Sequence, residues 1–217
     1  MVEKLRGDYS LHSYKEEIFL RVPRDSKVLE VGCNFGLLGK ALREKKNCIV
    51  YGIDFYDPVL DKAKKNLNVV KKVDLEKYSF PFKEKFDVII FEDVLEHLRY
   101  PEEILKIYKN MLNSNGKIIV SLPNIANIKI RFSLLLGNWN YKNSGILDKS
   151  HFRFYTKRTS NELLKKSGYN SKIVDFTSGF SFIFLRYFRP LKKIRKILCS
   201  VNPSLFAEQF ILEGRVR

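Results

Sequence analysis

The chain is poor in cysteine and has no long apolar run. Its three cysteines, Cys33, Cys48 and Cys199, form no CxxC pair. An odd number without such pairs predicts neither a disulfide framework nor a cysteine-ligated zinc site, and we expect a reducing, cytoplasmic compartment. No apolar run reaches the roughly 20 residues that span a bilayer. The charged first ten residues lack the apolar core of a signal peptide.

Acidic residues are also scarce relative to basic ones. The 217 residues include 40 Lys and Arg against 24 Asp and Glu, a formal net charge of +16. Such an excess indicates an anionic partner, which could be nucleic acid, a membrane surface or a phosphorylated substrate. The chain is rich in Lys, Asn, Ile, Phe and Tyr, as an AT-rich genome would encode. Either explanation fits the diffuse part of the charge.

Apolar runs alternate with amphipathic segments through residue 122. We predict strands at 28–32, 48–54, 69–74, 86–91 and 117–122, and helices at 14–21, 37–45, 57–67 and 101–112. Asp57 is expected to cap its helix, with Pro58 at the first helical position. The alternation predicts βαβ units and a parallel sheet. The strands are almost continuously apolar, so we expect helices on both faces of that sheet.

The pattern changes after residue 122. Residues 123–156 have mixed polarity, and a loop of that length is usually functional or disordered. A helix at 159–166 is predicted from a capping box of Thr159 and Glu162, followed by strands at 171–176 and 206–216. We divide the chain into an N-terminal cap segment (1–25), a main domain (26–177) with a substrate insertion (123–158), and a basic, aromatic appendage with the last strand (178–217).

Acidic side chains end four of the predicted strands: Glu30, Asp54, Asp74 and the Glu92–Asp93 pair. Ligands of open parallel sheets bind beyond the carboxyl ends of the strands, so these acids should share one cleft. Asp54 lies about twenty residues past a glycine turn, where an acid can accept hydrogen bonds from a ribose. The glycine spacing differs from the G-x-G-x-x-G of dinucleotide sites, and Glu30 would repel a pyrophosphate. The pattern favours a ligand with an amino or sulfonium group.

These stretches together resemble the class I S-adenosylmethionine-dependent methyltransferases. The motifs occur in the family's order at Val28–Gly36, Val50–Asp54, Val73–Leu75, Phe86–Leu98 and Leu112–Pro123. The fourth ends in Leu95-Glu-His-Leu98, as in ubiquinone-type and sugar-type small-molecule methyltransferases. The resemblance covers roughly residues 25–177. It implies a Rossmann-like three-layer α/β/α sandwich with a mostly parallel seven-stranded sheet and an antiparallel last strand.

The resemblance also implies S-adenosylmethionine as cofactor. Carried over by position, the cofactor-binding residues would be Glu30, Gly32, Cys33, Asn34, Gly36, Asp54, Phe55, Asp74, Leu75, Glu92 and Asp93. Asn34 replaces a glycine that the family usually has. Asparagine tolerates left-handed backbone geometry better than most residues, and its side chain could also reach the ligand.

The acceptor is expected to bind at residues 122–156, which resemble a subgroup associated with polysaccharide and glycan biosynthesis. Trp139 and Tyr141 would stack on a sugar, and Arg153 would hold an anionic group or form a structural ion pair. Methylation of a hydroxyl needs a proton acceptor. His151 is the first candidate, oriented by Asp148, and His97 is the second. The structural alternative is that Asp148 and His151 only stabilise the loop. No metal is expected.

Residues 180–198 combine aromatic and basic side chains. They are typical of contact with an anionic membrane surface, which would place the protein at the inner membrane surface of the cytoplasm. An oligomer interface or a solvated helix would fit as well, and the oligomeric state stays open. We expect methylation of a small-molecule or glycan acceptor, most plausibly a sugar hydroxyl. An RNA methyltransferase and a non-catalytic cofactor-binding module are the alternatives.

Overall fold

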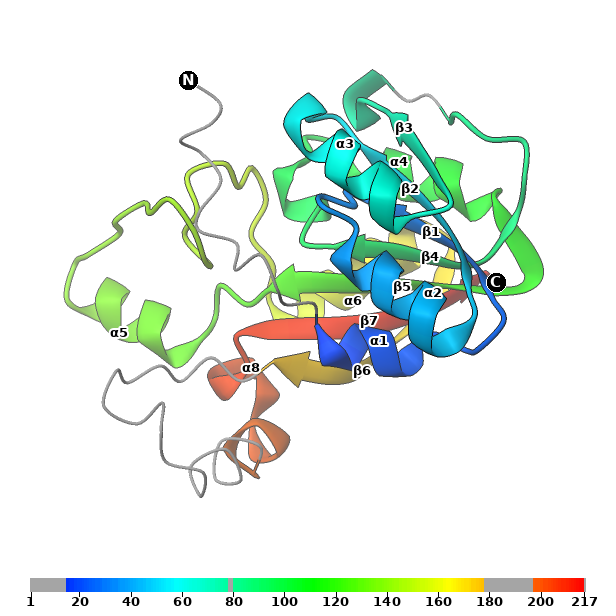
Figure 1. Ribbon diagram of the computed structural model, residues 1–217. Coiled ribbons are helices and arrows are strands. Elements are labelled where there is room, and N and C mark those ends of the chain that lie inside the picture. Colours follow the sequence, from blue (N-terminus) through cyan, green and yellow to red (C-terminus); the bar gives the residue numbers. More distant parts are fainter. Residues whose placement is uncertain (1–14, 78–79, 178–196, 217) are drawn as a thin grey trace.

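The computed structural model describes residues 15–77, 80–177 and 197–216. They form one seven-stranded sheet in the order β3-β2-β1-β4-β5-β7-β6 (Figure 1). The strands are β1 (Lys27–Val31), β2 (Ile49–Asp54), β3 (Val69–Lys72), β4 (Phe86–Glu92), β5 (Leu112–Pro123), β6 (Tyr169–Thr177) and β7 (Gln209–Val216). The helices are α1 (Glu16–Arg21), α2 (Leu37–Lys46), α3 (Asp57–Asn66), α4 (Pro101–Lys109), α5 (Ile128–Leu135), α6 (Lys157–Lys166) and α8 (Pro203–Phe206), with short 3-10 turns η2 (Leu75–Lys77) and η3 (Leu95–His97).

The first five strands are parallel, and β7 inserts antiparallel between β5 and β6. This topology confirms the predicted fold class, including the antiparallel last strand. The carboxyl ends of the five parallel strands therefore lie together at one edge of the sheet, as predicted.

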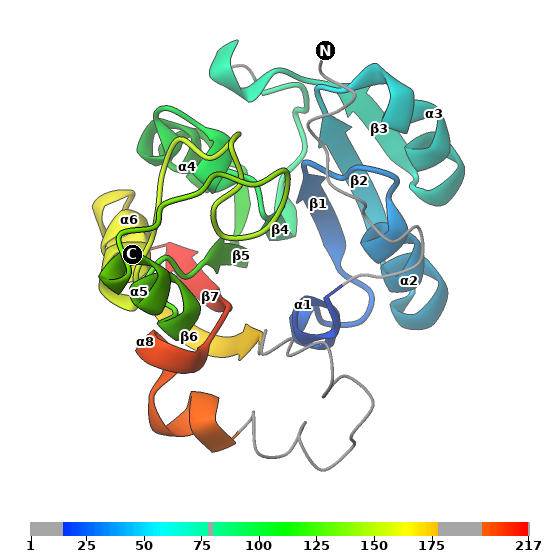
Figure 2. The same ribbon diagram turned by 90° about the vertical axis from the view of Figure 1, so that its left-hand side faces the viewer.

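Two apolar cores cover the two faces of the sheet. Alternate residues of β1 separate between them, with Val28 in one core and Leu29 and Val31 in the other. The first core is closed by α1, α2 and α3, and the second by α4 and α6 (Figures 1 and 2). The near-continuous apolar strands therefore reflect burial on both faces.

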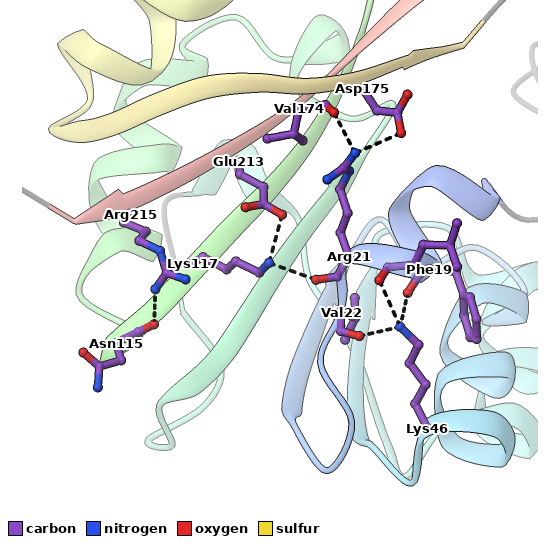
Figure 3. Close-up of polar contacts among 11 residues, drawn as sticks. Phe19, Arg21, Val22, Lys46, Asn115, Lys117, Val174, Asp175, Glu213 and Arg215 are labelled. Atoms are coloured by element: carbon purple, nitrogen blue, oxygen red, sulfur yellow. Dashed lines mark hydrogen bonds and ion pairs between the residues drawn. The ribbon is translucent and has the colours of Figure 1, made fainter. Parts of the chain in front are cut away.

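Long polar side chains fasten helix α1 to the sheet (Figure 3). The Lys46 ammonium donates to the Phe19 carbonyl at 2.6 Å, which ties α1 to α2. The Arg21 guanidinium pairs with Asp175 of β6 at 2.9 Å. The Lys117 ammonium of β5 donates to the Arg21 carbonyl at 2.9 Å. These contacts fix the position of α1 on the sheet, and residue 15, which precedes α1, belongs to the site described below.

Two predicted helix caps are wrong. Asp57 is the first residue of α3 and does not cap it; its carboxylate pairs with Lys72. Helix α6 begins two residues earlier than predicted, because its capping box joins Thr156 to Thr159. The carboxylate of Glu162 instead lies 3.7 Å from Arg158, one turn away. In α3 the acid pairs with a cation instead of capping the helix, whereas in α6 an earlier hydroxyl forms the cap.

Other differences concern the ends of elements. Helix α4 stops at Lys109, and Leu112 instead pairs with Phe86 at the start of β5. Strand β3 stops at Lys72, so Asp74 follows the strand rather than ending it. The segment 123–156 contains helix α5, which Asn127 caps by accepting from the Lys129 N–H at 3.0 Å. The N-terminal residues 1–14 and most of the basic tract, through residue 196, lie outside the described residues.

None of the helices within 15–77, 80–177 and 197–216 is long and apolar enough to cross a bilayer.

Candidate active site

A cavity of about 700 Å³ opens at the carboxyl ends of the parallel strands. Its walls come from the ends of β1, β2 and β4, from the turns η2 and η3, and from residues 144–152. Most of the predicted site residues line it: Glu30, Gly32, Cys33, Asn34, Asp54, Phe55, Asp74, Leu75, Glu92, Asp93, His97, Asp148 and His151. The structure thus brings the expected cofactor residues and the two histidines to one cavity.

The turn between β1 and α2 is left-handed at three positions. Gly32, Asn34 and Gly36 have φ angles of 69°, 48° and 71°. A Cβ on Gly32 would lie 2.6 Å from Val94 Cγ2, so the turn has no room for a side chain there. Gly36 does not line the cavity; it forms the N-cap of α2. The left-handed φ of Asn34 accounts for asparagine in place of the family's glycine.

The turn and β2 are joined through Asp54. The buried Asp54 carboxylate accepts the Asn34 N–H at 2.9 Å and the Tyr56 N–H at 3.0 Å. Each carboxylate oxygen can accept more than one hydrogen bond, so Asp54 retains capacity for hydroxyl donors from a ligand. The Asn34 Oδ1 atom is buried and has no hydrogen-bond partner within the described part of the chain. These two side chains suit a ligand that carries hydroxyl or amino donors.

Glu30 carries a buried carboxyl beside the same turn. Its side chain is 5% exposed, and its Oε2 has no partner among the residues that the structure describes. Burial raises the pKa of Glu30 well above its usual range, and the negative charges of Glu92 and Asp54 add to the shift. A cationic group of a ligand would favour the ionised form of Glu30. The residues present therefore fit a positively charged, hydroxyl-bearing ligand such as S-adenosylmethionine.

The acids at the end of β4 are neutralised by a residue that sequence reasoning missed. Lys15, just before α1, pairs with Asp93 and lies 3.5 Å from Glu92. Asp93 also accepts from Ser121 Oγ at 2.7 Å and Gln209 Nε2 at 3.0 Å. Burial alone would raise the pKa of Asp93, but the Lys15 charge and these hydrogen bonds hold it below its usual value.

Four more of the predicted cofactor residues line the cavity: Cys33, Phe55, Asp74 and Leu75. Phe55 is 56% exposed, which leaves its ring accessible to a ligand. Asp74 Oδ1 accepts the Glu76 N–H at 3.1 Å and so fixes the turn that contains Leu75. Cys33 is buried and belongs to the glycine turn.

The part of the cavity wall formed by η3 and the insertion holds the two histidines. Their rings meet edge to face, with centroids 4.7 Å apart. The Phe152 N–H donates to the Glu96 carbonyl at 2.9 Å, which ties the insertion to η3 and brings the rings together. The Asp148 carboxylate does not hydrogen-bond the His151 ring as predicted: its Oδ1 accepts from Ser150 Oγ at 2.6 Å, and only the Asp148 carbonyl accepts the His151 N–H, at 3.1 Å. The Ser150 hydroxyl in turn lies 3.1 Å from His97 Nδ1, so Asp148 positions His97.

The predicted acceptor-binding residues do not line the cavity. Trp139 packs edge-on against Tyr141 and against Phe154, which in turn contacts the His151 ring. The Arg153 guanidinium donates to the Arg99 carbonyl at 2.7 Å, and it forms no ion pair with another residue in the described part of the chain. Trp139 and Arg153 thus stabilise the insertion through contacts that lie outside the cavity.

The sheet order, the left-handed turn after β1 and the acid ending β2 define a Rossmann-like protein with a nucleoside-type site. A family model described as a methyltransferase domain matches residues 2–172. The chain belongs to this methyltransferase family, whose S-adenosylmethionine-dependent class I architecture the structure reproduces.

Similar proteins agree with this assignment. The chain is 32% identical over 110 residues to a ubiquinone biosynthesis O-methyltransferase of Histophilus somni, covering 46% of each protein. It is 30% identical over 115 residues to a protein of the same name from Coxiella burnetii, covering 51% of this chain and 48% of that protein. The chain thus spans about half the length of the curated relatives it matches.

Solved structures share the fold at low sequence identity. A SAM-dependent methyltransferase of Thermotoga maritima superposes with a TM-score of 0.64 at 16% identity, covering 93% of this chain and 86% of that one. One from Archaeoglobus fulgidus gives a TM-score of 0.61 at 21% identity, covering 91% and 88%. At these identities the likeness concerns the fold alone.

Proposed function

We propose that the protein transfers a methyl group from S-adenosylmethionine to a hydroxyl oxygen of a small molecule. One observation carries the proposal: the strand-end acids and the two histidines face the same cavity of about 700 Å³. A cofactor at one end and an acceptor at the other would share that space, which a two-substrate transfer requires.

The residues around the β1–α2 turn would hold the cofactor. Asp54 would accept hydrogen bonds from the ribose hydroxyls, and Glu30 would face the positively charged part of the molecule. Asn34 Oδ1 would accept a further donor, since it has no partner among the described residues. When bound, S-adenosylmethionine supplies an electrophilic methyl group on a sulfonium. These contacts would orient that group toward the wall that contains the histidines.

The histidine wall would activate the acceptor. Burial lowers the pKa of His151, and the neighbouring His97 lowers it further. The imidazole therefore stays neutral at pH 7 and can accept a proton. His151 Nδ1 lies 3.1 Å from the Ile146 carbonyl, an acceptor that places the proton on Nδ1 and leaves Nε2 as the basic atom. His151 is thus the first candidate for activating a hydroxyl, with His97 beside it.

Two acceptor classes are favoured by different observations. A sugar hydroxyl follows from the likeness of residues 122–156 to glycan-type methyltransferases. A hydroxyl on a quinone-related ring follows from the relatives, which are named for O-methylation in ubiquinone biosynthesis. Trp139 and Tyr141 lie outside the cavity in this structure, so stacking on a sugar would need the insertion to change its arrangement.

A panel of acceptors with radiolabelled S-adenosylmethionine tests the proposal. The panel includes nucleotide sugars, lipid-linked sugars, dihydroxylated benzoates and a structured RNA. We expect transfer to a hydroxyl acceptor, and at least a tenfold loss in His151→Gln. A matched control, Asn138→Ala, alters the same insertion away from the cavity and should keep full activity. Transfer to RNA alone, or full activity in His151→Gln, would overturn the corresponding part of the proposal.

A further inference from the structure

Three potential metal ligands meet on the histidine wall of the cavity. Glu96, His97 and His151 each offer one ligand atom, and these atoms lie within 4.8 Å of one another. All three residues line the cavity. They come from η3 and from the insertion, segments more than fifty residues apart, which the hydrogen bond from Phe152 to the Glu96 carbonyl holds together.

The Glu96 carboxyl is buried without a hydrogen-bond partner among the described residues. Its side chain is 1% exposed, and neither Oε1 nor Oε2 has a hydrogen-bond partner within the described residues. A buried carboxyl without a hydrogen-bond partner destabilises the folded state, because it gives up its hydration without replacement. Because Glu96 lines the cavity, its oxygens are placed to bind a ligand that enters it.

Both histidines are held as metal-binding histidines usually are. His151 Nδ1 faces the Ile146 carbonyl at 3.1 Å, and His97 Nδ1 faces the Ser150 carbonyl at 3.2 Å. Metal-ligating histidines typically donate one ring N–H to a carbonyl or carboxylate and coordinate through the other nitrogen. Here each Nδ1–H has such an acceptor, and Nε2 carries the lone pair. The Ser150 hydroxyl, fixed by Asp148, gives His97 a second oxygen at 3.1 Å.

We propose that Glu96, His97 and His151 bind one divalent transition-metal ion of the zinc, cobalt or manganese type. Two imidazoles and one carboxylate suit these ions, and with three protein ligands they leave coordination positions open. Zinc–nitrogen bonds are about 2.0–2.1 Å long, so tetrahedral ligand atoms lie roughly 3.3 Å apart. The present spacing requires a contraction of about 1.5 Å at its widest, which side-chain rotations can supply.

The ion would also deepen the proposed function, and this step rests on it. The open coordination positions would face the cavity in which the acceptor hydroxyl is proposed to bind. A bound cation lowers the pKa of a coordinated hydroxyl. In the ion-loaded protein, His151 would therefore hold the ion that activates the acceptor, and the hydroxyl proton would pass to solvent water in the open cavity instead of to His151.

Cobalt and zinc titrations test the site without cofactor or acceptor. Untagged protein is treated with a chelator, exchanged into chelator-free buffer and titrated with Co²⁺ and Zn²⁺. Calorimetry gives the stoichiometry, and visible absorption of Co²⁺ reports nitrogen ligation. We expect one ion per chain, and at least tenfold weaker binding in Glu96→Gln and in His151→Gln. The matched control is Glu103→Gln, which removes an exposed carboxylate of α4 and should bind like the wild type.

Folding of each variant is checked by thermal unfolding and by S-adenosylmethionine binding, which the proposal leaves unchanged. If Glu96→Gln does not fold, His151→Gln decides alone. No specific Co²⁺ or Zn²⁺ binding by the wild type, or equal affinity in a folded variant, would overturn the metal site. Ion binding without methyl transfer to any acceptor would support the metal site and contradict the proposed function, so the two failures are distinguishable.

Discussion

Replacing Lys15 with methionine should destabilise the protein through the acids at the end of β4. The ammonium pairs with Asp93 and lies near Glu92, and methionine keeps most of the stem while removing the charge. Breaking one side of a buried pair costs about 3–5 kcal/mol. The side chains of Lys15 and Asp93 are 15% and 26% exposed, so water screens part of this. We expect the free energy of unfolding to fall by roughly 2–3 kcal/mol at pH 7.5.

The pH dependence of this loss identifies its cause. The pKa of Asp93 is lowered in the folded protein. Its contribution to stability is therefore present above the unfolded-state pKa of about 3.9 and disappears as the pH falls through the folded-state pKa. Burial alone would lower the pKa of Lys15, but the charges of Asp93 and Glu92 raise it, so its contribution persists up to about pH 10.4. In Lys15→Met the pKa of Asp93 should rise. The stability deficit of Lys15→Met relative to the wild type should therefore become smaller as the pH falls from 8 to 5.

Urea denaturation across this pH range measures the effect, with Lys106→Met as the matched control. Lys106 pairs with Glu103 on the exposed side of α4, and its loss should cost less than about 0.5 kcal/mol. A Lys15→Met deficit as small as that of the control, or one that does not change with pH, would refute the role of Lys15.

Three further predictions concern the cavity walls. Gly32→Ala places a Cβ 2.6 Å from Val94 Cγ2 at a residue whose φ is 69°. The substitution should lower the free energy of unfolding by about 1–3 kcal/mol in urea denaturation and should weaken cofactor binding. Wild-type stability and affinity would contradict the steric argument. The pKa of Glu30 is raised in the folded protein, so the wild type should lose thermal stability as the pH rises above about 4.3. Glu30→Gln should lose less stability over the same pH range. Parallel plots of melting temperature against pH for the two proteins would count against this prediction. In metal-free protein, the His151 ring should titrate below pH 6.5 when followed by NMR. The free energy of unfolding should fall as the pH drops below that value. A titration midpoint at or above pH 6.5 would contradict the burial of His151 beside His97.

The sequence predicted the part of the site that depends on short-range structure. Glu30, the glycine turn and Asp54 belong to two adjacent strands and the turn after the first, and parallel strands place their ends together. Asn34 was also predicted to tolerate a left-handed conformation, and its φ of 48° agrees. Regular periodicity and turn chemistry are sufficient for such features, which do not depend on distant partners.

The rest depends on contacts that sequence spacing does not encode. Asp93 is joined to Lys15 across 78 positions and to Gln209 across 116, through the docking of α1 and the antiparallel insertion of β7. The sequence shows Glu96 only as part of the Leu95–Leu98 motif. That its carboxyl has no hydrogen-bond partner among the described residues is evident only from the folded cavity. Trp139 was placed by analogy, and its packing against Phe154 could not be predicted from composition.

Calorimetric titration with S-adenosylmethionine tests the central claim most directly. The wild type should bind one molecule per chain, and Asp54→Asn should bind at least tenfold more weakly, because a hydrogen bond to a charged group contributes about 1.5–3 kcal/mol. Asp61→Asn changes an exposed acid of α3 and should bind like the wild type. Absence of binding in the wild type, or equal affinity in Asp54→Asn, would contradict the assignment of the cofactor to the cavity beyond β1 and β2.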